Sequence, residues 1–324
     1  MATLKDVAAR AGVTVTTVSR MLNKRVKVSD ATCQRIETAM KELGYQPNEL
    51  AQSLAKKTSN FIGLIVPSAS HYFFCEIVSR VEHYVTKNGY RLLLCASNHE
   101  REKELEYFQM LGANKVAGVI VASRTQNLQD GLRFDAPILS IDRKLSPSIP
   151  SVSSDNYAGG VLAAELLLRK GCKHPAYFSG SPWLDMDANK RYSGFEDTLR
   201  RNGVVPLTLE LSEERFMSMR YDDVIAEFLR GHPMLDSVFT SNDVIAAQVI
   251  RYCLNSGIAV PERMKVIGYD DIGLTSLYYP TITTIRQPID EICRYAVESV
   301  ISYYDKLVPV NTVFPVTLVE REST

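Results

Sequence analysis

The 324-residue chain lacks most of the patterns that mark metal, membrane or nucleotide-dependent proteins. Its six cysteines stand singly with no Cys-x-x-Cys pair, which argues against a zinc site and a disulfide framework. Its five histidines are dispersed, and His-Glu-x-x-His, Gly-x-Gly-x-x-Gly after a strand and a Gly-Lys-Ser/Thr phosphate loop are all missing. No apolar run approaches membrane-spanning length, and no signal-peptide pattern precedes the first predicted helix. We therefore expect a cytoplasmic protein that needs no metal or cofactor and contacts no membrane.

Charge of one sign is not in excess overall, since 37 Lys and Arg balance 37 Asp and Glu. The two signs are unevenly spread, however. Residues 1–60 contain ten cationic and five anionic side chains, so the rest of the chain has five more acids than bases. A basic segment on an acidic body favours attraction to a phosphate backbone at that one end. A solvated lysine face is the simpler alternative, but it does not explain the asymmetry.

Residues 4–23 have the pattern of two short helices joined by a tight turn. Apolar residues recur at helical spacing through Ala11, Gly12 can end the first helix, and Thr14 can cap the second. The second helix buries Val18 and leaves small or hydroxylated side chains outward, with an arginine one turn on. Such a helix fits the major groove of DNA, although helical hairpins without nucleic acid share the pattern.

A third helix is predicted over residues 30–43, followed by Pro47, which prevents the helix from continuing. Residues 49–57 form a helical patch too short to be stable alone. We interpret residues 1–47 as a DNA-binding head, 48–59 as a hinge helix and 60–324 as the body.

The body alternates short aliphatic runs with amphipathic stretches, which predicts an α/β fold of doubly wound parallel sheets. The predicted strands are 62–66, 91–96, 116–122, 137–142, 175–179, 237–240 and 265–268. The length of the body favours two lobes over one large sheet. We expect lobe 1 at about 60–155 and 288–312, and lobe 2 at about 156–287 and 313–324.

Polar residues follow several of these strands, where doubly wound lobes bind their ligands. Carboxylates, amides and nearby aromatic rings suit a polyhydroxylated ligand such as a sugar. The residues concerned are Ser68, Tyr72, Phe73, Asp142, Arg191, Phe216, Asn242 and Asp270. Each of them could instead serve only as a local cap or turn residue. Asp270 and Asp271 could form a carboxylate pair, but adjacent side chains diverge, which argues against a shared catalytic site.

The chain closely resembles the lactose/galactose repressor family of bacterial transcription regulators over nearly its full length. The resemblance rests on DVAARAGVTVTTVSRMLN, YQPNELAQSLAKKTSNFIGLIVP, the Arg-x-x-Gly-Phe unit at 191–195, SND at 241–243, VIGYDD at 266–271 and TTIRQP at 283–288. Within the family the chain looks most like Gram-positive sucrose repressors, with ribose repressors next. The resemblance implies a helix-turn-helix head, a hinge helix and two lobes of the periplasmic-binding-protein type.

The resemblance also implies roles for individual residues. It implies that Val15, Thr16 and Arg20 contact operator bases. It also implies that Thr17, Ser19 and Asn23 mostly contact phosphates. Leu54 matches the hinge leucine that wedges into the minor groove together with its dimer mate. Thr3, Asn48 and Ala51 complete the expected DNA-contacting set. In the body, Gln287 joins Asp142, Arg191, Asn242 and Asp270 as a residue expected to line the effector cleft.

The expected function is therefore that of a dimeric repressor, not an enzyme, released from a near-palindromic operator by a sugar or sugar phosphate. The alternative that the ligand is a corepressor, which strengthens DNA binding, stays open. A global catabolite regulator that docks a phosphocarrier protein is a second alternative, weakened by Tyr279 where those relatives have arginine. The chain ends shortly after the last strand without a tetramerising tail, so a dimer is expected. A transport-type sugar-binding protein is a more distant alternative.

Overall fold

The computed structural model describes residues 2–22, 28–45, 58–125, 134–180, 186–305 and 307–324. The DNA-contact candidates Asn23, Asn48, Ala51 and Leu54 lie outside these ranges, as does nearly all of the expected hinge. The chain divides into two compact units, residues 1–60 with 114–116 and the remainder.

The head is formed by α1 (Leu4–Ala11), α2 (Val15–Leu22) and α3 (Asp30–Glu42). Helix α1 begins with a capping box, in which the Thr3 hydroxyl accepts from the Asp6 backbone N–H and the Asp6 carboxylate accepts from that of Thr3. It ends at Gly12, whose φ of +64° lies in the left-handed region that glycine adopts without steric cost. A small core of apolar side chains then joins the three helices: Val7, Ala8, Ala11, Val18, Ile36 and Ala39.

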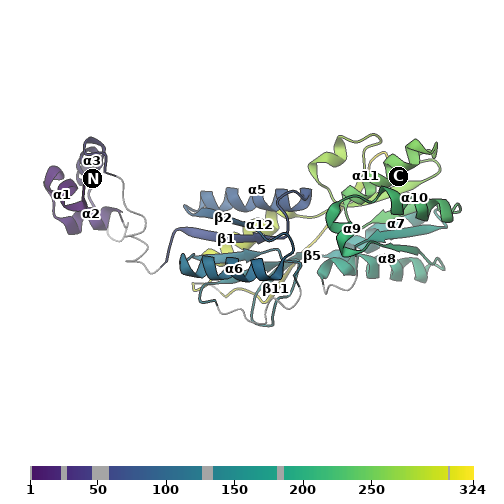
Figure 1. Ribbon diagram of the computed structural model, residues 1–324, viewed down its shortest axis with the longest axis horizontal. Coiled ribbons are helices and arrows are strands. Elements are labelled where there is room, and N and C mark those ends of the chain that lie inside the picture. Colours follow the sequence, from purple (N-terminus) through teal and green to yellow (C-terminus); the bar gives the residue numbers. More distant parts are fainter. Residues whose placement is uncertain (1, 23–27, 46–57, 126–133, 181–185, 306) are drawn as a thin grey trace. The chain divides into compact units, whose positions relative to one another are not determined.

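Lobe 1 is a six-stranded sheet in the order β11-β5-β4-β3-β1-β2, with every neighbouring pair parallel (Figure 1). Its strands are β1 (Phe61–Val66), β2 (Arg91–Ala96), β3 (Gly118–Val121), β4 (Ile138–Ile141), β5 (Ser151–Ser154) and β11 (Asn311–Phe314). Its helices are α5 (Tyr72–Lys87), α6 (Arg101–Ala113) and α12 (Ile289–Ile301). Helices α5 and α12 share one buried cluster with β1, β3 and β4, so the carboxy-terminal helix completes the core of the first lobe.

Lobe 2 is a second six-stranded sheet in the order β12-β10-β9-β8-β6-β7, parallel except where β10 meets β12. Its strands are β6 (Pro175–Ser179), β7 (Leu207–Glu210), β8 (Ser237–Thr240), β9 (Lys265–Asp270), β10 (Thr283–Arg286) and β12 (Thr317–Val319). Its helices are α7 (Asn156–Arg169), α8 (Lys190–Arg201), α9 (Glu213–Ser218), α10 (Asp222–Gly231) and α11 (Asp243–Asn255), with 3-10 turns η1 (Asp187–Asn189) and η2 (Gly273–Ser276).

The chain passes between the two sheets three times: after β5, between β10 and α12, and between β11 and β12. The last passage follows Phe314, two residues beyond the limit of lobe 1 expected from the sequence. The α/β prediction of two mainly parallel sheets is confirmed. All seven predicted strands are present. Five other strands among the described residues were missed, and each of them contains serine or threonine, as in the Ser-Val-Ser-Ser of β5.

Candidate functional site

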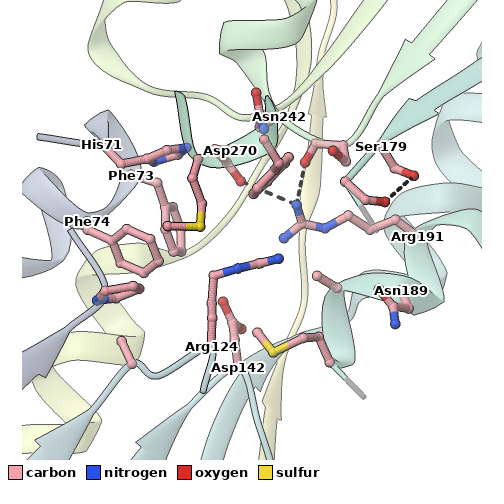
Figure 2. A pocket seen from close by; sticks show the side chains of 18 of the residues that line it. His71, Phe73, Phe74, Arg124, Asp142, Ser179, Asn189, Arg191, Asn242 and Asp270 are labelled. Carbon is pink, nitrogen blue, oxygen red and sulfur yellow. Dashed lines mark hydrogen bonds and ion pairs between the residues drawn. The ribbon is translucent and has the colours of Figure 1, made fainter. Parts of the chain in front are cut away.

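A cavity of about 530 Å³ opens in the body where the carboxyl ends of strands from both sheets meet. This volume lies within the range of small-molecule sites. Seven of the nine residues expected at the effector cleft line it: Ser68, Phe73, Asp142, Arg191, Phe216, Asn242 and Asp270. Figure 2 shows the labelled members of this set converging from both lobes.

Arg191 is held in the cavity wall by contacts with four residues. Its Nε donates to Asn156 Oδ1 at 2.7 Å and its Nη1 to the Ser241 carbonyl at 2.6 Å. The guanidinium also lies 3.6 Å from Asp270 Oδ1 and 3.6 Å from the centre of the Tyr269 ring. Because these contacts leave few alternative rotamers, Arg191 presents its remaining N–H groups to the cavity in one orientation.

One glycine in α7 and one in α8 allow Arg191 to lie at the cavity. A Cβ at Gly160 would lie 2.0 Å from the Arg191 carbonyl oxygen, and one at Gly194 would lie 2.0 Å from the Tyr157 carbonyl oxygen. The two helices can therefore cross in backbone contact only because both positions are glycine. The glycine of the Arg-x-x-Gly-Phe unit thus places the arginine that precedes it.

Asp142 and Asp270 are buried carboxylates at the ends of β4 and β9, and both adopt positive φ, +58° and +107°. Burial raises the pKa of Asp142 to about 6 against the opposing attraction of Arg191. Burial likewise raises the pKa of Asp270 to about 7, although Arg191 and a hydrogen bond from Gln287 favour its ionised form. Backbone strain and raised pKa together are typical of residues held for function.

Asn242 and Asp243 of the Ser-Asn-Asp unit at 241–243 have different roles. Asn242 caps α11 by accepting from the Ile245 N–H through Oδ1, while its Nδ2 has no hydrogen-bond partner among the described residues. Asp243 instead ties the start of α11 to β10 and to the segment after β9, because it accepts from the Thr284 hydroxyl and from the Ile272 N–H. The amide of Asn242 and the hydroxyl of Ser241, which also lines the cavity without a hydrogen-bond partner among the described residues, are therefore the groups that can bind a ligand hydroxyl.

Asp270 and Asp271 point to different surroundings, as the sequence predicts for adjacent residues. Asp271 accepts from Arg286 Nε at 2.6 Å and from Arg321 Nη2 at 2.7 Å. Burial alone would raise the pKa of Asp271, but these two guanidinium groups hold it below its usual value. Asp271 is a brace between β10 and the carboxy-terminal segment, so only Asp270 faces the cavity.

Two of the expected cleft residues do not line the cavity. Gln287 lies behind Asp270, donating to its Oδ1 at 2.6 Å and accepting from the Ser154 hydroxyl at 2.6 Å, so it orients the carboxylate. Tyr72 begins α5 with 45% of its surface exposed, while the next two residues, Phe73 and Phe74, turn into the cavity. Helical spacing explains the difference, since consecutive residues lie 100° apart around the axis.

The cavity also contains residues that sequence reasoning missed. The most informative are His71, Phe74, His99, Arg124, Tyr177 and Met186. Arg124 and His99 follow β3 and β2, so the rule that strand ends bind ligands could have found them. Tyr177 lies within β6 and Met186 in a loop, and no sequence pattern distinguishes them from core or linker residues.

The exposed face of α2 is the candidate nucleic-acid surface of the head. Val15, Thr16 and Arg20 are exposed, and Val15 has 39% of its surface free. Thr17 is half-buried and its hydroxyl pairs with that of Thr14 at 2.9 Å, while Ser19 is also half-buried. The expected base-reading residues are therefore those that α2 leaves most accessible.

Among the described residues, no group of three or more His, Cys, Asp and Glu side chains is arranged to hold a metal ion. Nor does any described helix have the length and apolarity needed to cross a membrane.

Comparison with known proteins decides the family. The pattern of bacterial regulatory proteins of the lacI family matches residues 3–48, and that of the periplasmic binding protein-like domain matches residues 138–324. The sucrose operon repressor of Streptococcus mutans is 38% identical over 324 residues, covering 100% of this chain and 99% of the relative. The chain belongs to the lacI family of bacterial regulatory proteins.

Other members of the family agree with this assignment. The ribose operon repressor of Bacillus subtilis is 36% identical over 326 residues, with 100% of this chain and 99% of the relative covered. Among solved structures, the lac repressor dimer bound to operator and the anti-inducer ONPF superposes with a TM-score of 0.86. It is 27% identical, with 99% of this chain and 98% of that chain covered. The resemblance to this family inferred from sequence motifs is confirmed.

Proposed function

We propose that this lacI-family regulator is a dimeric, sugar-responsive repressor that acts in the cytoplasm and catalyses no reaction. Two heads would bind the half-sites of a near-palindromic operator, and a sugar bound between the lobes would release them. The observation that carries the proposal is the cavity itself. It combines a fixed guanidinium, two buried carboxylates and an amide lacking a partner with the aromatic rings of Phe73 and Phe216.

These groups suit a polyhydroxylated ligand. Carboxylates accept from hydroxyls, Arg191 and Asn242 donate to them, and aromatic faces cover the C–H side of a sugar ring. A sucrose-type operon is the first candidate and a ribose-type operon the second, because the relatives described above carry those names. We propose Ser68, Phe73, Asp142, Arg191, Phe216, Asn242 and Asp270 as effector contacts, with Gln287 as an orienting residue.

The division of the chain supports the same function. We propose a head at 1–47, a hinge at 48–59 and a body at 60–324. The compact unit of residues 1–60 with 114–116 supports a division near residue 60. The proposed DNA contacts in the head are Thr3, Val15, Thr16, Thr17, Ser19 and Arg20. Four further proposed contacts lie outside the described residues: Asn23, Asn48, Ala51 and Leu54.

The substitution Leu54→Ala should weaken operator binding without changing sugar affinity.

Operator binding tests the role of the head. The operator is first selected from random duplexes with the wild-type protein. If the Arg20 guanidinium contacts a base edge, Arg20→Ala should bind this operator about 1–3 kcal/mol less tightly than the wild type does. Arg35→Ala removes an equal charge from an exposed position of α3. It should weaken binding to selected and unselected duplexes alike. Equal loss on both kinds of duplex in Arg20→Ala would contradict base reading by Arg20.

Release by sugar tests the role of the body. Arg191→Ala and Asp270→Ala should retain operator affinity but no longer respond to a sugar that releases the wild-type protein from DNA. The response is measured as operator binding against sugar concentration at fixed salt. A variant released at the wild-type concentration would remove that residue from the effector site, and a sugar that tightens binding would make the ligand a corepressor.

A further inference from the structure

The charges lining the cavity are separated into two groups. The carboxylates of Asp270 and Asp142 act on Arg191, which Asp270 also contacts directly at 3.6 Å. A second group, His71, His99 and Arg124, comes from the start of α5 and from the segments after β2 and β3. The charges that act on His71 are both basic, those of Arg124 and His99. One wall of lobe 1 therefore holds basic side chains, with Arg124 as its permanent cation, whereas the Arg191 side is balanced by acids.

His71 is the member whose surroundings most clearly call for a ligand. Its ring contacts that of Phe74 at 5.5 Å between centroids, and neither ring nitrogen has a hydrogen-bond partner among the described residues. Burial, with the charges of Arg124 and His99, lowers the pKa of His71 to about 4. His71 is half-buried, but covered ring nitrogens without partners are costly. An anion would supply an acceptor for the ring N–H and an opposite charge for Arg124.

Arg124 and His99 are held so that they can join His71. The Arg124 guanidinium lies 4.8 Å from the centre of the Phe216 ring, and Figure 2 shows this side chain reaching into the cavity. A stacked guanidinium keeps its planar fork of N–H donors oriented, which matches the oxygens of a phosphate. His99 lines the same cavity from a turn in which both Asn98 and His99 adopt left-handed φ, +53° and +65°. Such backbone strain persists where the surroundings fix it.

We propose that the effector is a phosphorylated sugar, whose phosphate is bound by Arg124, His71 and His99 while its hydroxyls contact Arg191, Asp270 and Asn242. This proposal rests on the proposed function and narrows its ligand class. Donors on three separate segments suit the three terminal oxygens of a phosphate monoester better than the two oxygens of a carboxylate.

Calorimetric titration of the full chain with matched ligand pairs tests the proposal. The panel contains sucrose and ribose, the 6-phosphate and 5-phosphate esters of these sugars, further hexoses with their monophosphates, and sugar acids of similar size. At least one ester should bind tenfold or more tightly than its parent sugar. Inorganic phosphate should compete with the ester but not with the parent sugar.

Two variants locate the phosphate. Arg124→Gln and His71→Asn should each lower ester affinity at least tenfold while parent-sugar affinity changes less than threefold. Arg220→Gln, at an exposed arginine that does not line the cavity, is the matched control and should change neither affinity. If one of the two variants does not fold, the other still tests the proposal. Retained binding of the parent sugar shows that the cavity of a variant is intact.

Each outcome separates this proposal from the function on which it rests. Sugars that bind as tightly as their esters, a sugar acid that binds as tightly as the ester, or a preference for the ester that survives both substitutions would overturn the phosphate site. In all three cases a sugar-responsive repressor would stand. Failure of every ligand in the panel to bind or to release operator would overturn both.

Discussion

At the residue scale, the cavity is built from side chains whose burial costs stability. Asp270 is 4% exposed, and its pKa of about 7 means that the folded protein disfavours its ionised form. The neighbouring Asp142 is affected in the same way, with a pKa of about 6. Natural proteins retain such groups where function requires them, at the expense of folding free energy.

The pH dependence of Asp270→Asn follows from this shift. Because the folded pKa is raised, ionisation destabilises the fold progressively as pH increases from about 4 to above 7. Asp270→Asn should therefore raise the free energy of unfolding at pH 8, by about 1–4 kcal/mol for a shift of this size, and the gain should shrink toward pH 4. Chemical denaturation across this pH range measures it.

Asp305→Asn, at an exposed aspartate, is the control and should leave stability unchanged throughout. A stability difference for Asp270→Asn that is constant with pH would contradict the ionisation argument. Sugar affinity gives a second readout, since the wild type should bind its effector less tightly as pH falls below about 7 and the accepting carboxylate becomes protonated.

At the scale of elements, the crossing of α7 and α8 connects the fold to the site. Backbone contact at Gly160 and Gly194 brings the first turn of α8 to the cavity, so Arg191 is placed by helix packing and not by its own side chain alone. A Cβ at Gly160 would meet backbone atoms, which cannot rotate away as a side chain would.

Gly160→Ala should therefore separate the two helices and displace Arg191. The expected cost is about 1–3 kcal/mol of folding free energy, with a loss of effector affinity of tenfold or more. Denaturation and calorimetry measure the two effects. Gly231→Ala at the end of α10, where an added Cβ would meet nothing within 4 Å, should leave both unchanged or slightly raise stability. Wild-type affinity in Gly160→Ala would show that the crossing does not place Arg191.

At the scale of the whole molecule, charge is divided between a basic amino-terminal segment and an acidic remainder. Residues 1–60 have twice as many cationic as anionic side chains, whereas the rest of the chain has more acids than bases. This distribution directs the amino-terminal segment, and not the body, toward the phosphates of DNA.

Operator affinity should accordingly fall steeply with salt. A protein that neutralises six to ten phosphates loses about 10³–10⁵ in affinity between 50 and 200 mM salt, and we expect a loss of at least a hundredfold for the dimer. Operator titrations at four salt concentrations, with protein kept well above the dimer dissociation constant, give the slope. A loss smaller than tenfold would mean that the basic segment does not neutralise the DNA backbone.

The sequence alone determined the elements in which local chemistry and burial agree. Gly12 and Thr14 set the turn of the head, and the apolar runs of β1 and β3 are recognisable because strands covered on both faces are rich in apolar residues. The sequence also located Asp142, Asn242 and Asp270, because parallel topology places every carboxyl strand end along the same edge of its sheet.

Only the tertiary structure decided which other side chains reach the cavity. Strands β5 and β10 hold serine and threonine, whose pairing depends on neighbours far along the chain. Gln287 looked like a ligand contact, yet it supports Asp270 from behind. His71, just before α5, and Arg124, after β3, line the cavity, and that placement depends on packing between distant segments, which local sequence does not encode.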